Sequence, residues 1–132
     1  MADFNPGDAL PELHVTPDAG LTRRYAEASG DPNPIHTDEE FAKKVGLPGV
    51  ILHGLYSMAQ VARAHTDVVG GDPRSLKRLA VQFRGMGFPE QEIVVTASVK
   101  SADGDRITTD TVAAQGDSRI IRNAEAELEL PG

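Results

Sequence analysis

The residues best suited to chemistry lie in the stretch DPNPIH, which carries Asp31, Asn33 and His36. Pro32 and Pro34 each fix a backbone torsion and push the residue before them out of helical space. The sequence therefore predicts an extended and rigid segment. A loop of this kind can bring a carboxylate and an imidazole toward one water molecule, which is the arrangement of a general acid–base site.

The same stretch also has a purely structural interpretation. Asp-Pro and Asn-Pro are ordinary turn-starting pairs, so Asp31 and Asn33 could simply accept hydrogen bonds from backbone amides. A metal site is a third interpretation, but Asp31, His36 and Asp38 lack the spacing of known zinc or calcium motifs. These residues alone leave the structural and the catalytic interpretation open.

A second feature lies downstream, where an apolar segment runs into His53 and Gly54 at the predicted start of a long helix. A helix N-terminus leaves backbone N–H groups without partners and carries a partial positive charge. Because glycine lets a ligand approach the backbone closely, the Gly54 N–H is a candidate donor to a carbonyl oxygen on which negative charge develops. His53 itself fits either packing or a secondary role in the site.

Three predicted helices position these residues. The first spans 16–30, with Thr16 as its cap and Gly30 at its end, and a short second helix opens at Thr37. We predict that His14 and His65 are only surface or helix-end histidines. The third helix runs from 53 to the glycine pair at 70–71 and should be largely buried. Its expected apolar stripe consists of Leu55, Met58, Ala59, Ala62 and Val69, widened by Val61 and Val68.

The rest of the chain alternates with a period of two and predicts strands. A short strand is expected within 9–15, and four further strands in meander-like succession cover 79–84, 93–100, 106–114 and 118–130. Turns are expected at 103–104 and 116–117. The predicted fold class is α+β, an antiparallel sheet packed on a helix, whose exposed edges favour self-association.

Length and composition narrow the functional classes. The 132 residues predict one domain, 1–132, and the absence of cysteine excludes disulfides and thiolate sites. We expect a cytoplasmic protein, because the N-terminus lacks the features of a signal peptide and no apolar run is long enough to span a membrane. A net charge of −7 argues against nucleic-acid binding. A phosphate-bearing ligand would need a local cationic patch, for which the candidates are Arg74, Lys77, Arg78, Arg84, Lys43 and Lys44.

The pattern from Tyr25 to Ala42, with Ser-Gly-Asp-Pro-Asn-Pro-Ile-His at its centre, resembles the signature of the MaoC-like enoyl-thioester hydratases and dehydratases. Members of that family have the hot-dog fold, in which a sheet wraps a long central helix. His53-Gly54 matches the family's His-Gly at the start of that helix, and residues 76–99 are similar to its second and third strands. The departures, such as Ala28 in place of a larger aliphatic residue or glycine, remove no residue needed for chemistry.

The resemblance implies a hydro-lyase of fatty acid metabolism. It would reversibly hydrate trans-2-enoyl thioesters of CoA or acyl-carrier protein to (3R)-3-hydroxyacyl thioesters. Asp31 and His36 would act on the water, the Gly54 N–H would bind the thioester oxygen, and Asn33 would shape the loop. Tyr56 and Met58 are candidates for the acyl pocket, although their helical spacing is also typical of a core.

No metal, redox cofactor or covalent nucleophile is implied. A hot-dog thioesterase and a thioester-binding subunit of a heteromeric dehydratase are the alternative functions. We expect a homodimer, or a heterodimer with another hot-dog subunit, and no membrane insertion.

Overall fold

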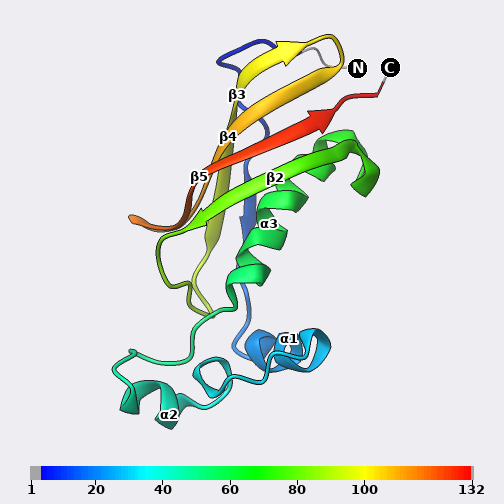
Figure 1. Cartoon of the computed structure of the whole chain (residues 1–132). Helices are drawn as coiled ribbons and strands as arrows, with labels where there is room; N and C mark the ends of the chain where they lie inside the picture. The colour runs from blue at the N-terminus through cyan, green and yellow to red at the C-terminus, as the bar shows by residue number, and fades with distance from the viewer. Residues whose placement is uncertain (1–3, 132) are drawn as a thin grey trace.

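The computed structural model describes residues 4–131 and contains a five-stranded antiparallel sheet that wraps a central helix (Figure 1). The strands are β1 (Leu13–Val15), β2 (Leu76–Phe83), β3 (Ile93–Asp103), β4 (Arg106–Gln115) and β5 (Ser118–Glu129). The helices are α1 (Leu21–Ser29), α2 (Glu39–Lys44) and the central α3 (Gly54–Thr66), with 3-10 turns at Pro34–His36, Asp67–Val69 and Pro73–Ser75. The predicted α+β class is therefore confirmed.

The strand order is β1-β3-β4-β5-β2. Strands β3, β4 and β5 form the expected meander, with positive φ at Gly104 and Gly116 in its two turns. The prediction was wrong for β2, which pairs with β5 instead of β3. The other edge of β3 is occupied by β1, where Leu13 lies opposite Val95. Strand β2 is consequently an edge of the sheet.

The period-two pattern is confirmed by burial in β3, β4 and β5, but it was wrong for β2, where Leu79, Ala80 and Val81 are all partly buried and Phe83 is exposed. Alternate residues of β3, from Ile93 to Val99, face the helix side. Alternate residues from Ala124 to Leu130, in and just after β5, face the same side. The buried apolar side chains form two clusters, one around Val61 and Ile93 and the other around Val69 and Leu128.

A polar network is buried in the same core. The His65 Nδ1–H donates to the Val61 carbonyl at 2.8 Å, and its Nε2 accepts from the Thr109 hydroxyl at 2.7 Å. The Thr109 and Thr111 hydroxyl oxygens lie 3.3 Å apart. His65 has no solvent exposure, so its prediction as a surface or helix-end residue was wrong. Its buried ring is tolerated because both nitrogens have hydrogen-bond partners.

The buried face of α3 also differs from the predicted stripe. The side turned to the sheet carries Ser57, Gln60, Val61, Ala64 and His65. Leu55 is 63% exposed, and Ala59 is exposed too. Hydrophobicity alone misplaces this face because a polar side chain can find partners inside the core, as His65 does. An apolar side of α3 therefore remains uncovered in the single chain.

Two helix starts lie later in the chain than predicted. Helix α1 begins at Leu21, because the Asp18 side chain accepts from the Gly20 N–H at 2.9 Å and closes a turn there. Helix α2 is capped by Asp38, which accepts from the Phe41 N–H at 3.1 Å, and not by Thr37. The predicted end of α1 at Gly30, with φ of 73°, is confirmed.

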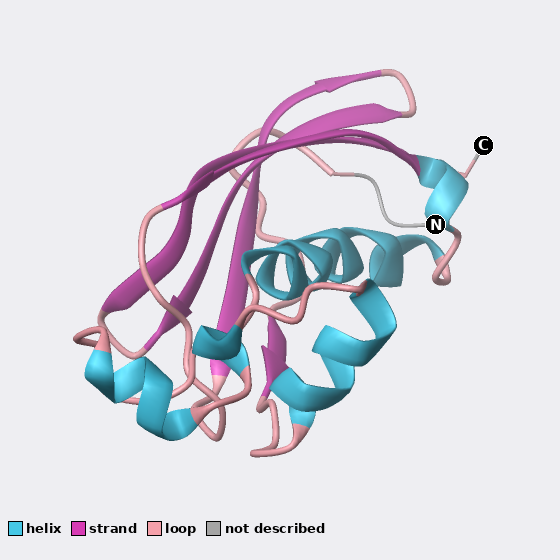
Figure 2. Cartoon of the chain, turned by 60° about the horizontal axis from the view of Figure 1, so that its bottom comes forward, coloured by secondary structure: helices cyan, strands magenta, loops and turns pink. Residues whose placement is uncertain are grey.

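Figures 1 and 2 show α1, α2 and the chain between them gathered at the end of the molecule where α3 begins. No helix within residues 4–131 is long and apolar enough to cross a membrane. The segment inspected for a signal peptide includes residues 1–3, which lie outside the described residues. The arrangement brings the DPNPIH stretch to the N-terminus of α3.

Candidate active site

The DPNPIH stretch is shaped by its own polar side chains. The Asp31 carboxylate accepts from the Asn33 N–H at 3.4 Å, and the Asn33 side chain accepts from the Ile35 N–H at 3.2 Å. Asn33 thereby caps the 3-10 turn Pro34–His36. The expected extended backbone reaches only to Asn33, because proline suits the first position of a helical turn and the cap stabilises it. Asn33 thus lies where the loop-shaping role was expected.

Asp31 and His36 face each other across a short gap. The His36 Nε2 lies 4.0 Å from the Asp31 Oδ2, and the imidazole is 9% exposed while the carboxylate is 54% exposed. The gap is too long for a direct hydrogen bond, but a water about 2.8 Å from both atoms would span it. His36 Nδ1 donates to the Ile51 carbonyl at 2.7 Å. In the neutral ring this leaves the Nε2 lone pair directed at the gap.

His53 joins the two parts of the site. Its ring stacks on that of His36, with 3.8 Å between centroids and 19° between planes. Its Nε2–H donates to the Asp31 carbonyl oxygen at 3.3 Å. Burial lowers the pKa of His53, and the neighbouring His36 ring acts in the same direction. His53 is therefore an uncharged support for both the imidazole and the loop that carries Asp31.

Aromatic rings extend this support. Tyr25 lies against His53 with centroids 4.7 Å apart, and it contacts Tyr56 edge-on at 5.8 Å. Burial raises the pKa of Tyr56, so its phenol stays protonated. Tyr56 and Met58 are half-buried and pack against the first core cluster. The predicted pocket residues thus belong, at least in part, to the core.

Gly54 follows His53 and opens α3, as predicted. Among residues 4–131, no backbone or side-chain oxygen accepts its N–H. A Cβ added at Gly54 would lie 3.2 Å from the Phe83 ring, which is half-exposed. The sequence did not indicate a role for Phe83 in the site, because the alternation around Phe83 in β2 is typical of any sheet residue. It also gave no sign of the Ile51 carbonyl, because a backbone acceptor leaves no side-chain pattern. Both contacts join segments far apart in the chain.

The site also has donor atoms suited to a cation. Asp31, His36 and His53 each offer one such atom, and these atoms lie within 4.8 Å of one another. His36 Nδ1 and His53 Nε2 already donate to carbonyls, which leaves His36 Nε2, His53 Nδ1 and the carboxylate. Water and a metal ion are thus both chemically compatible with this cluster.

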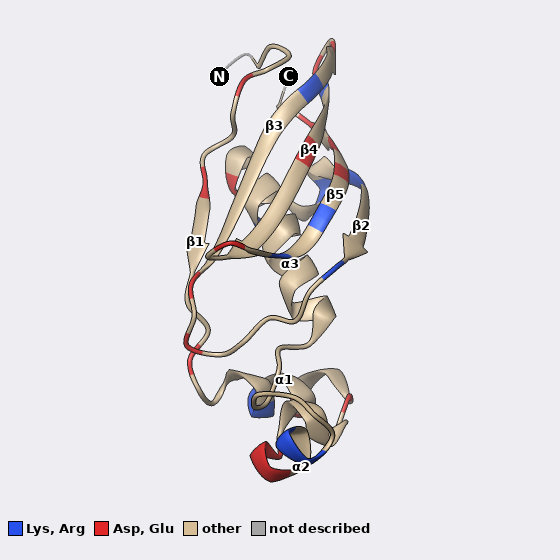
Figure 3. Cartoon of the chain, turned by 90° about the vertical axis from the view of Figure 1, so that its left-hand side faces the viewer, with Lys and Arg blue, Asp and Glu red and all other residues tan. Residues whose placement is uncertain are grey.

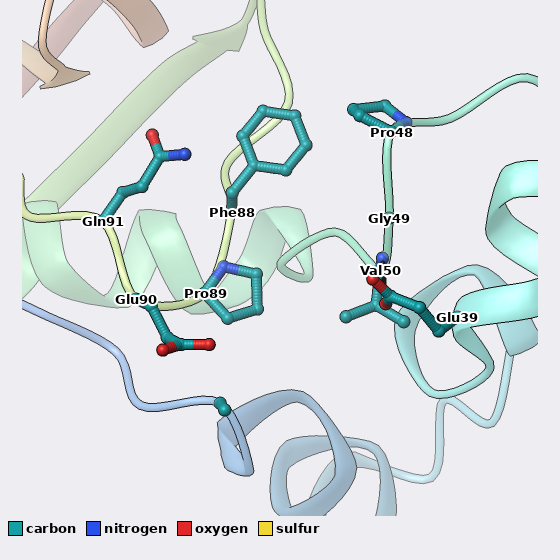
Figure 4. Close-up of a pocket in the computed structure, with 9 residues that line it drawn as sticks. Glu39, Pro48, Gly49, Val50, Phe88, Pro89, Glu90 and Gln91 are labelled. Carbon is teal, nitrogen blue, oxygen red and sulfur yellow. Dashed lines mark hydrogen bonds between the residues drawn. The ribbon is translucent and has the colours of Figure 1, made fainter.

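A pocket of about 500 Å³ lies between the loop before α3 and the loop between β2 and β3 (Figure 4). Its walls come from the loop before α3, with Pro48 and Val50, and from the loop between β2 and β3, with Phe88 and Pro89. Val50 precedes Ile51, the acceptor for His36. The pocket also carries the acidic residues Glu39 and Glu90, and none of Asp31, His36 and Gly54 lines it.

Gln115 holds one wall of this pocket in place. Its side-chain oxygen accepts from the Phe88 N–H at 2.8 Å, and its amide donates to the Phe88 carbonyl at 2.8 Å and to the Gln91 carbonyl at 3.0 Å. The Leu52 N–H donates to the Gly87 carbonyl at 2.8 Å, which ties this loop to the one before α3. The pocket is consequently held by hydrogen bonds across its walls.

Comparison with known proteins identifies similar chains. The family model described as "MaoC like domain" matches residues 5–119. The fatty acid synthase beta subunit hexB of Dothistroma septosporum is 34% identical over 113 residues, which cover 83% of this chain and 6% of that protein. The enoyl-CoA hydratase ChsH3 of Mycobacterium tuberculosis is 31% identical over 119 residues, covering 86% of this chain and 40% of that protein.

Among solved structures, one titled "MaoC-like dehydratase" superimposes with a TM-score of 0.91 at 31% identity. The match covers 98% of this chain and 41% of that one, and it confirms the hot-dog fold. In each of these comparisons the chain spans less than half of the matched protein.

Proposed function

The chain belongs to the MaoC-like domain family, and from this we propose that it is a hydro-lyase acting on trans-2-enoyl thioesters. The product of hydration would be the (3R)-3-hydroxyacyl thioester, and the reaction would be reversible. The observation that carries the proposal is the Asp31–His36 pair, 4.0 Å apart, with the His36 ring stacked on His53, which precedes the Gly54 N–H that has no acceptor within residues 4–131. The name of ChsH3, an enoyl-CoA hydratase, supports the same reaction class.

In the proposed reaction, His36 Nε2 takes a proton from a water that Asp31 orients. The water oxygen bonds to C3, the C2–C3 π electrons move toward the thioester carbonyl, and C2 then receives a proton returned through the same pair. His36 can act as base because its Nδ1–H is held by the Ile51 carbonyl, which leaves Nε2 free. A positioned group of this kind typically contributes about 10²–10⁴-fold to the rate.

Charge develops on the thioester oxygen during this step, and the Gly54 N–H is the proposed donor to it. The α3 N-terminus adds its partial positive charge at the same point. Glycine is needed there so that the oxygen can approach the amide between His53 and the Phe83 ring. The acyl chain would run past Tyr56 and Met58, which keep some exposed surface.

We further propose that the chain works with a second hot-dog subunit, either another copy or a different chain. Strand β2 is an edge, and the apolar side chains Leu55, Phe83 and Met86 near one end of it are 63%, 51% and 44% exposed. Covering them would remove both an open edge and apolar surface from water. We also propose that the acyl group of the substrate is carried as a thioester of CoA or of acyl-carrier protein.

The test is hydration of crotonyl-CoA by the purified chain, followed by loss of enoyl absorbance. Asp31→Asn and His36→Gln should each lower kcat by at least about 10²-fold, while unfolding curves stay close to those of the wild type. Under this mechanism activity should survive EDTA, because the pair acts on water and requires no metal ion. Release of free thiol would instead indicate the thioesterase, and full activity in both variants would refute the mechanism.

A further inference from the structure

Two of the cations that a phosphate could have used are already paired. Arg74 lies 3.0 Å from the carboxylate of Asp72. Arg78 lies 3.3 Å from that of Glu125, which Lys100 also contacts at 3.1 Å. Their charges are neutralised locally, so neither is a free receptor for an anion.

Arg84 differs, because it forms no ion pair within residues 4–131 and its backbone lies near that of two other arginines. The backbone N–H of Arg84 donates to the Ile120 carbonyl at 3.0 Å, which places the Arg84 backbone beside Arg119 at the start of β5. The contact is close: a Cβ on the next residue, Gly85, would lie 2.8 Å from the Arg119 carbonyl oxygen. Arg122 follows on β5, opposite Gln82 near the end of β2. Figure 3 shows basic segments on β5 and just after β2.

These three residues, the arginine cluster, lack anionic partners. Within residues 4–131, no carboxylate forms an ion pair with Arg84, Arg119 or Arg122, whereas six other cations are paired. The Arg122 Nε–H is buried and has no acceptor in that part of the chain. A buried guanidinium donor without an acceptor is costly unless an anion supplies one. The cluster is also a local excess of positive charge on a protein of net charge −7.

The cluster connects directly to the candidate site. Phe83, whose ring flanks Gly54, is the residue before Arg84. The pocket between the loop before α3 and the β2–β3 loop is an unsuitable alternative for an anion, because it carries Glu39 and Glu90. A phosphate attached to a thioester at Gly54 would therefore be repelled from that pocket and attracted toward the arginines.

We propose that the arginine cluster binds the phosphate group of the thioester's carrier, and this rests on the proposed function. CoA and a carrier protein's prosthetic group share a phosphate joined to the sulfur by a flexible pantetheine arm. Guanidinium groups suit this ligand because their planar donors bind phosphate oxygens in pairs. The arm would run from the Gly54 amide past Phe83 to the end of β2.

Calorimetric titration with CoA, 4′-phosphopantetheine and pantetheine tests the site without requiring catalysis. The wild type should bind CoA at least about tenfold more tightly than pantetheine, which has no phosphate. The double variant Arg84→Gln/Arg119→Gln should lose that tenfold and bind pantetheine unchanged. The double variant Arg74→Gln/Arg106→Gln is the matched control, because it removes the same two charges from exposed ion pairs with Asp72 and Glu129 and should leave all three affinities as they are.

Two patterns of loss both support the site. Equal losses for CoA and phosphopantetheine identify the phosphate that a carrier protein also has, and a loss for CoA alone identifies its nucleotide phosphates. Unchanged CoA affinity in the double variant, or an equal loss for pantetheine, would overturn the inference. A chain that binds CoA through these arginines but hydrates no enoyl thioester would refute only the proposed function.

Discussion

Gly54→Ala separates catalysis from stability at the start of α3. The backbone of Gly54 is helical, so alanine fits its conformation, and alanine is favoured over glycine inside a helix by up to about 1 kcal/mol. Opposing this, the new methyl would lie 3.2 and 3.4 Å from two atoms of the Phe83 ring. That ring is half-exposed and can shift by a few tenths of an ångström. We therefore expect the free energy of unfolding to change by less than about 1 kcal/mol.

Activity should respond far more strongly. The methyl occupies the approach to the Gly54 N–H, and loss of one oxyanion donor typically costs about 10²–10³-fold in kcat, or about 2.7–4 kcal/mol. The assay is kcat and KM for crotonyl-CoA hydration, with urea unfolding measured on the same preparation. A variant whose kcat stays within about threefold of the wild type would show that this amide is not the donor.

A second variant shows which effect of the methyl matters. In Gly54→Ala/Phe83→Leu the shorter side chain leaves room for the methyl without displacing a ring. Continued inactivity would locate the loss at the obstructed amide. Recovery would mean that the displaced Phe83 ring, and not the amide, caused the loss, and the oxyanion assignment would then be abandoned.

Two further predictions concern the buried histidines. His53→Phe keeps a stacked ring but removes the N–H that donates to the Asp31 carbonyl. The kcat should fall about fivefold, which corresponds to the loss of one hydrogen bond, and KM should change little. An unchanged kcat would contradict the supporting role of His53. Burial lowers the pKa of His65, so the unfolded chain binds a proton below its ordinary value of 6.5 while the native chain does not. The free energy of unfolding should therefore decrease as pH falls below 6.5, by up to about 1.4 kcal/mol per pH unit for this residue. Urea unfolding at pH 7.5 and 5.5 measures this, and an equal decrease in His65→Gln would contradict it.

The sequence predicts those parts of the fold that depend on local pattern. The alternation from Ala124 to Leu130 identifies a strand with one buried face, and Gly30 and Gly116 mark a helix end and a turn through their positive φ. Structural features that depend on contacts between distant parts of the chain were not predictable in this way. The pairing of β2 with β5 and the face that α3 turns to the sheet depend on partners distant in the chain, such as Thr109 for His65.

The candidate site follows the same division. The stretch around Asp31 and His36 and the glycine at the start of α3 could be singled out because residue type and spacing carry the signal. The stacking of His53 on His36, the Ile51 carbonyl and the Phe83 ring could not, because each contact joins segments separated by loops. Packing decides these contacts, and a single sequence does not display it.

The buried link between His65 and Thr109 sets the axial position of the central helix. If α3 moved along its axis by one residue relative to β4, the hydrogen bond between the His65 imidazole and the Thr109 hydroxyl would break. Both groups would then be buried without a partner. His65 and Gly54 belong to one rigid element, eleven residues or about 16 Å apart along the axis. A contact at the far end of the helix therefore helps to fix the position of the Gly54 amide relative to His36, and changes at Thr109 should alter turnover without touching the substrate.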